Sequence, residues 1–181
     1  MKLSSRVAHV SLAAVLALSL APRAFAQESK SAPLAKQLAA ALDAAKLDSV
    51  AAKDPDAGDV FVAALYFPNM QFLVVSGKYS APQLLATRLT NKEYRDVYLD
   101  LNGAATAKTF IEDPGCDGLK AKRENNQAFD TVELEGKRTM FDGEWKAQKM
   151  SEQDYTKAFA AADERYVRIL TALLAQLKKT T

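Results

Sequence analysis

The chain has 181 residues, with 24 basic and 22 acidic side chains, a single histidine and a single cysteine. One cysteine cannot form a disulfide within its own chain, so stability must come from packing. The phosphate-binding patterns GxxxxGK[S/T] and GxGxxG do not occur in the sequence, which excludes those two nucleotide-binding designs.

The N-terminus has the three parts of a secretory signal peptide. Lys2 and Arg6 precede an apolar stretch, residues 7–20, that is too short to anchor in a bilayer. Residues 24–26, Ala-Phe-Ala, fit the small pockets of a signal peptidase. We expect a periplasmic or secreted protein with no membrane span after cleavage. The predicted parts are a cleaved signal at 1–26, a flexible leader at 27–33 and a single domain at 34–181.

Removal of the signal changes both the charge and the available chemistry. Lys2, Arg6 and Arg23 leave with it, so 21 basic residues remain against 22 acidic ones, and no basic excess for nucleic acid is left. His9, the sole histidine, leaves as well. This excludes Ser-His-Asp and Cys-His nucleophilic sites, histidine-ligated zinc, and haem or iron held by histidine. Chemistry based on carboxylate, lysine, tyrosine or a bound organic cofactor remains open.

The first half of the mature chain predicts a helix and a β-hairpin. Apolar residues recur every three or four positions over 33–53, which indicates an alanine-rich helix, and the DPDAGD segment at 54–59 ends it. Runs of β-formers at 60–67 and 71–79, separated by Pro68-Asn69, predict an antiparallel hairpin. Both runs are apolar on both faces, so we place them at the centre of a sheet that is covered on each side.

The second half predicts one more short helix and several strands. Residues 82–89 follow a capping serine and a proline, and residues 95–101 alternate apolar and polar side chains as a strand does. A strand over 108–113 comes next. Residues 129–135 and 137–141 then form a second hairpin around Glu135-Gly136.

A long amphipathic helix is expected at the C-terminus. Ser151 and Asp154 have the spacing of a helix cap, and an apolar stripe continues to Lys178 and Lys179, where cations favour a helix end. The stripe is typical of a helix that covers one face of a sheet. The alternative is a homodimer seam through Tyr155, Phe159, Tyr166 and Leu173.

Few candidate sites emerge. Ser76, Lys78, Tyr79 and Ser80 lie where a buried strand meets a helix, so backbone N–H groups and a lysine could hold a phosphate or carboxylate there. A turn that satisfies only its own backbone is the alternative. Cys116, in a Pro-Gly-Cys-Asp-Gly turn, is either incidental or the site of an intermolecular disulfide.

Two acidic turns suggest calcium without the right order of ligands. The turn at 54–59 has glycine and aspartate transposed relative to an EF-hand, and Leu65 stands where the bidentate glutamate belongs. We therefore expect no metal at that turn, and none at the second acidic turn formed by Glu112, Asp113 and Asp117.

The order of these elements carries a resemblance. The hairpin, the Ser-x-Lys-x-Ser turn, the short leucine-bearing helix and the alternating strand resemble FMN-binding split-barrel proteins of the pyridoxamine-phosphate-oxidase-like kind over residues 58–142. That resemblance implies a flavin-binding barrel with oxidoreductase activity. Segments 94–101 and 141–145 are also similar to exported bacterial proteins that are uncharacterised.

The predicted fold is α+β. It comprises an antiparallel sheet of about five to six strands, open or curled into a split barrel, packed by the long C-terminal helix and a shorter N-terminal one. The predicted function is a non-catalytic binding or accessory role without a cofactor. The alternatives are a small-ligand or FMN-binding barrel and a structural homodimer.

Overall fold

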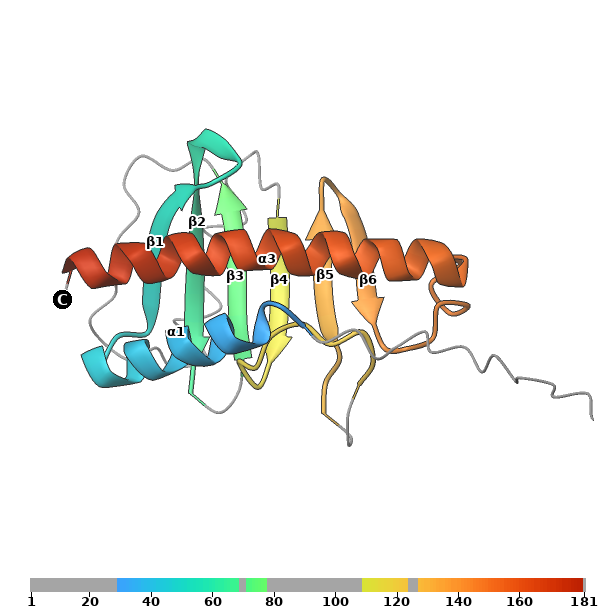
Figure 1. Ribbon diagram of the computed structural model, residues 1–181, viewed down its shortest axis with the longest axis horizontal. Helices are drawn as coiled ribbons and strands as arrows, with labels where there is room; N and C mark the ends of the chain where they lie inside the picture. Colours follow the sequence, from blue (N-terminus) through green and yellow to red (C-terminus); the bar gives the residue numbers. More distant parts are fainter. Residues whose placement is uncertain (1–28, 69–70, 78–108, 124–126, 181) are drawn as a thin grey trace, which may run out of the picture.

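Six strands form one antiparallel sheet in the computed structural model, which describes residues 29–68, 71–77, 109–123 and 127–180. The strands follow one another in chain order, and helices α1 and α3 pack on the sheet (Figure 1). The predicted α+β class is therefore confirmed. The elements are α1 (Ala32–Ala45), β1 (Ser49–Asp54), β2 (Ala57–Phe67), β3 (Gln71–Gly77), β4 (Thr109–Pro114), β5 (Asp130–Leu134), β6 (Lys137–Phe141) and α3 (Glu152–Thr180).

Both helices cover the same face of the sheet. Figure 1 shows α3 crossing the strands and α1 running beside its C-terminal half in the same direction. The apolar stripe of α3 faces inward as predicted, and each of its members from Tyr155 to Leu177 is buried against the sheet. Phe141 of β6 packs edge-on against Tyr155 and Phe159, at ring-centroid distances of 5.6 Å and 5.3 Å. This interface is the main core of the domain.

Strands β2 and β3 are buried on both faces, as their sequences predict. Val62 and Val74 point toward the helices and belong to the main core. Leu65, Leu73 and Val75 point to the opposite face and belong to a second apolar cluster, which also includes Phe67 and Phe110. The register Val62↔Ser76 to Phe67↔Gln71 confirms the predicted antiparallel hairpin. Alternation of the side chains across the strand assigns its two apolar sets to different layers.

The first helix is shorter than predicted. It ends at Ala45 instead of reaching Lys53, because Lys46 adopts a left-handed conformation with φ of 58° and Leu47 N donates to Leu42 O at 3.0 Å. Residues 49–54 form β1, which pairs with β2. Alanine favours a helix at Ala51 and Ala52, but backbone pairing with a neighbouring strand outweighs that preference. The DPDAGD turn is real, and it joins two strands rather than ending a helix.

The later strands agree closely with their predicted ranges. β4 begins one residue after the expected start, and β5 and β6 form the second hairpin. Glu135 and Gly136 have φ values of 49° and 80°, as a two-residue turn of type I′ requires. The predicted helix at 82–89 and the predicted strand at 95–101 lie outside the described residues.

The sheet is open, with β1 and β6 as its edges among the described strands. The split-barrel form of the prediction is therefore wrong. Successive pairs run from β1–β2 to β5–β6, and no pairing within the described part of the chain joins the two edges. The long helix α3 crosses one face of this open sheet (Figure 1).

The expected flexible leader is anchored from Ser29 onward. Asp163 of α3 accepts hydrogen bonds from Ser29 Oγ at 3.1 Å, Lys30 N at 2.8 Å and Ser31 N at 3.0 Å. Ser31 is fully buried, and its Oγ accepts a bond from Leu119 N at 3.0 Å. A carboxylate that accepts several backbone N–H groups fixes the chain locally.

Candidate functional site

Ser76 is the one residue of the predicted ligand turn that the structure describes. It is fully buried in β3, opposite Thr109 of β4, and its Oγ has no hydrogen-bond partner among the described residues. Lys78, Tyr79 and Ser80 lie outside the described residues. The ligand turn therefore stays a prediction.

Cys116 is buried in the loop that follows β4. It is 5% exposed and has a φ of 55°. Burial, together with the nearby carboxylates of Asp113 and Asp117, raises the pKa of its thiol. An intermolecular disulfide through Cys116 would require this loop to open, and it too stays a prediction.

The same loop buries the carboxylate of Asp113. Residues 113–120, here named the acidic loop, fold back so that Gly118 N and Asp117 N donate to this carboxylate at 3.0 Å and 3.2 Å. Tyr166 OH of α3 donates to it at 2.9 Å. Burial outweighs these hydrogen bonds and raises the pKa of Asp113 to about 7.

Asp130 at the start of β5 is a second buried carboxyl beside the acidic loop. It is 5% exposed and accepts a hydrogen bond from Lys120 N. Burial, with a smaller contribution from the negative charge of Asp113, raises its pKa to about 8. The Lys120 ammonium pairs instead with Asp117. Two carboxyl groups therefore influence this region, and the pKa of each is raised from its ordinary value into the range of neutral pH.

An arginine cluster joins α3 to the turn between β1 and β2. Arg165, 8% exposed, donates to Asp54 at 2.8 Å and 2.5 Å and to Asp56 at 2.7 Å. Its Nε and Nη2 also donate to Thr109 Oγ1. Arg168, with a side chain 48% exposed, donates to the same Asp56. We name these five residues the arginine cluster.

The contacts of the arginine cluster are satisfied internally. Every N–H group of Arg165 has an acceptor within the cluster. Burial alone would raise the pKa of Asp56, but hydrogen bonds and positive charge from Arg168 and Arg165 outweigh it and lower that pKa. A hollow of about 380 Å³ adjoins the cluster, and Glu135 also lines it. We interpret the cluster as a cross-link between helix and sheet.

The calcium question at the DPDAGD turn has a structural answer. Asp54 and Asp56 point their carboxylates at guanidinium groups, which already supply the positive charge. Within the described ranges, no group of three or more histidine, cysteine, aspartate or glutamate side chains could hold a metal ion.

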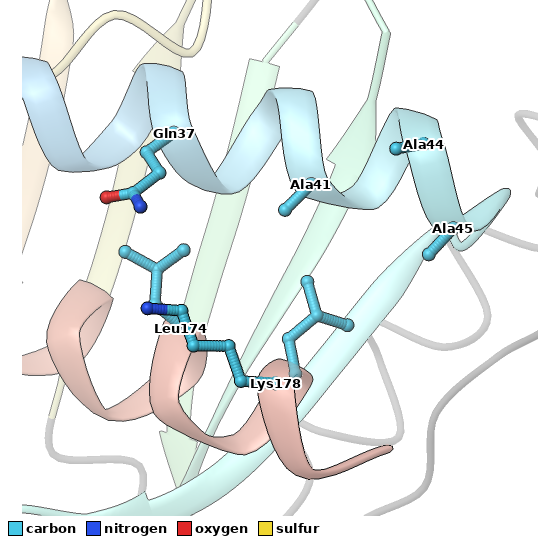
Figure 2. A pocket seen from close by; sticks show the side chains of 7 residues that line it. Gln37, Ala41, Ala44, Ala45, Leu174 and Lys178 are labelled. Carbon is cyan, nitrogen blue, oxygen red and sulfur yellow. The ribbon is translucent and has the colours of Figure 1, made fainter. Parts of the chain in front are cut away.

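An apolar hollow lies between α1 and the end of α3. It has a volume of about 400 Å³, and Figure 2 shows α1 and α3 as its two walls. Leu174 and Leu177 are 7% and 3% exposed and form its floor. We name it the helix groove, defined by Gln37, Ala41, Ala44, Ala45, Leu174, Leu177 and Lys178.

The predicted dimer seam is occupied by the protein's own core. Tyr155, Tyr166 and Leu173 are fully buried and Phe159 is 2% exposed, so none offers surface to a second copy. A homodimer would have to use other residues.

Sequence reasoning missed the arginine cluster and the helix groove for different reasons. Arg165 interrupts the buried face of α3 three residues after Ala162, and an arginine in such a position signals a buried acidic partner. No comparable signal exists for the helix groove, because its residues come from helices at opposite ends of the chain.

No family model, curated protein or solved structure matches this chain. Within the described residues, neither helix is long and apolar enough to cross a membrane. Any functional proposal must therefore rest on the geometry of the molecule itself.

Proposed function

We propose that this chain is an exported, non-catalytic binding protein that takes small apolar ligands in the helix groove. One observation carries the proposal: a hollow of about 400 Å³ with a leucine floor and alanine walls. Hollows of roughly 300–1,000 Å³ with mostly apolar linings and a few polar groups are the usual form of small-molecule sites. The polar members of this lining are Gln37 and Lys178.

The alanine side chains explain why a groove exists at this place. Methyl groups at Ala41, Ala44 and Ala45 fill little of the space between the two helices. Leu174 and Leu177 reach the floor and leave the upper part of the groove open. Larger side chains on this face of α1 would fill the hollow. The lining, as far as the described residues form it, offers no acid and base pair, which favours binding over catalysis.

Export is supported by the N-terminal sequence. The predicted signal peptide contributes the apolar run and the Ala-Phe-Ala end. N-terminal sequencing of the protein recovered from an exporting cell should begin at Gln27. A sequence that begins at Met1 would contradict export.

The binding proposal is tested with Nile red, a neutral dye that fluoresces in apolar surroundings. The wild-type protein should enhance its emission, and Ala41→Trp should abolish the enhancement because the indole fills the groove. Ala40→Trp is the matched control, since Ala40 is an exposed residue of α1 that does not line the groove. Circular dichroism should show that both variants are folded. Equal emission with both variants would mean that the dye binds elsewhere.

A further inference from the structure

We propose, building on the binding function above, that the natural occupant of the helix groove is a single acyl chain with an anionic end group, that is, a free fatty acid. The charges of the lining carry this inference. Among the described residues, Lys178 is the charged member of the lining, and no carboxylate of these residues lines the groove. Among the described residues, Lys178 has no ion-pair partner. An apolar hollow with one available cation complements an apolar chain with one negative charge.

The polar groups of the groove lie together. In the view of Figure 2, the Gln37 amide and the Lys178 amine are toward one end, and Ala44 and Ala45 are toward the other. An acyl chain can therefore place its head group beside Gln37 and Lys178 and its tail over the alanines.

The surroundings of the groove favour an anion as well. From Arg165 to Thr180, α3 carries no carboxylate side chain, and Lys179 adds a second cation next to Lys178. The amide of Gln37 supplies N–H donors that a carboxylate accepts. Negative charge at the head-group end is therefore met by donors and cations.

The arginine cluster is the other place where an anion could bind. Its arginines are already paired with carboxylates, so we exclude it as the site of the head group. Arg165 uses its donors on Asp54, Asp56 and Thr109. Asp56 also accepts from Arg168 at 3.0 Å and 3.1 Å. An incoming carboxylate would have to displace carboxylates that are already held in place. Lys178 has no such competitor in the part of the chain that the structure describes.

The test compares dodecanoate with dodecanol, which share a chain length and differ in charge. Binding to the wild-type protein is measured by displacement of Nile red and checked by calorimetry. Dodecanoate should bind about two- to five-fold more tightly than dodecanol, the range expected for one solvent-accessible ion pair. Lys178→Ala should remove this preference, so that dodecanoate and dodecanol bind the variant equally. Lys179→Ala, the matched control, should retain it, because Lys179 does not line the groove.

Each outcome separates the two proposals. Equal binding of dodecanoate and dodecanol to the wild-type protein overturns the fatty-acid inference and leaves the binding function standing. Equal loss of the preference in Lys178→Ala and Lys179→Ala also overturns it, since the effect would then be a general one of surface charge. If neither compound binds, the binding function fails together with the inference.

Discussion

Two neighbouring residues of α3 serve two buried carboxylates in opposite ways. Arg165 neutralises Asp54 in the arginine cluster, whereas Tyr166 gives Asp113 in the acidic loop a neutral hydroxyl donor. Asp54 and Asp113 are buried to a similar degree, at 3% and 0% exposed. The carboxylates of Asp54 and Asp113 are therefore buried to a similar degree, and they differ in the side chain that donates to them.

The pKa values differ between an exposed carboxylate and two buried ones. Asp56, which is exposed and lies between two guanidinium groups, has a lowered pKa, whereas the buried Asp113 and Asp130 have pKa values raised to about 7 and about 8. Guanidinium partners favour the ionised form of Asp56, and burial favours the protonated form of Asp113 and Asp130. The stabilising effect of the arginine cluster should therefore depend on the positive charge of Arg165, and that of the acidic loop should depend on pH.

Removal of the central cation should have the largest effect. Arg165→Met leaves Asp54 buried without a partner, and loss of one partner from a buried ion pair costs about 3–5 kcal/mol. Urea denaturation of the variant and the wild type measures this loss. A loss below about 1 kcal/mol would show that water reaches Asp54 in the variant, and that the pair is not truly buried.

A change of pH should destabilise the acidic loop in the alkaline direction. Because the folded-state pKa values of Asp113 and Asp130 are raised, their stabilising contribution is fully present below the unfolded pKa and is lost as the pH rises through 7 and 8. The free energy of unfolding should fall by about 2–4 kcal/mol between about pH 6 and pH 9, since one pKa unit corresponds to about 1.4 kcal/mol.

The pH profile is simplified by the absence of histidine from residues 29–181, so no imidazole titrates in the window. The buried Cys116 thiol, whose pKa is raised, adds to the loss of stability at the alkaline end. Asp130→Asn imitates the protonated carboxyl and should flatten the profile and stabilise the protein at the alkaline end. A profile that is flat in the wild type would mean that both carboxyls are ionised throughout the window.

Loss of the tyrosine donor should have a smaller effect. Tyr166→Phe removes the hydroxyl that donates to Asp113, which should cost about 1–3 kcal/mol and raise the pKa of Asp113 further. The midpoint of the pH profile should then shift upward. Tyr155→Phe is the control: it removes a buried hydroxyl that donates to Ala121 O and should destabilise the fold without moving the midpoint.

The outer arginine should matter least. Arg168 is 48% exposed and shares Asp56 with Arg165, so Arg168→Gln should cost less than about 1 kcal/mol. Salt screens the ion pair between Arg168 and Asp56. Added salt should therefore lower the free energy of unfolding of the wild-type protein by less than about 1 kcal/mol through this pair. A loss as large as that of Arg165→Met would show that the two arginines act as one unit.

Local patterns predicted several elements correctly. The two-sided apolar runs of β2 and β3, the Glu135-Gly136 turn and the capped stripe of α3 all have the predicted form. Ser151 caps α3 as expected, since its Oγ accepts from Asp154 N at 3.1 Å. In each case the determining signal lies within one element, so it can be read without knowledge of the neighbours.

The main error of the sequence-based prediction is the helix expected over residues 49–54, which form strand β1. This error has a physical cause. Residues 49–54 are rich in alanine and contain Lys53, so their own preference extends the helix. They become a strand because β2 offers a free edge whose backbone groups need partners. In the turn that separates α1 from β1, Lys46 adopts the left-handed backbone conformation. A lysine at this position indicates a helix end less clearly than a glycine would.

By itself, the amino-acid sequence determined the helix and strand periods, the turns that break them and the absence of histidine from residues 29–181. Tertiary structure alone decided which carboxylate meets Arg165, which one meets Tyr166, and that α1 and α3 leave a groove between them. The reason is separation along the chain. The periodic pattern of a helix or strand depends on residues within about one to three helical turns of one another. The contacts named above join residues that come close only after the sheet and helices have packed.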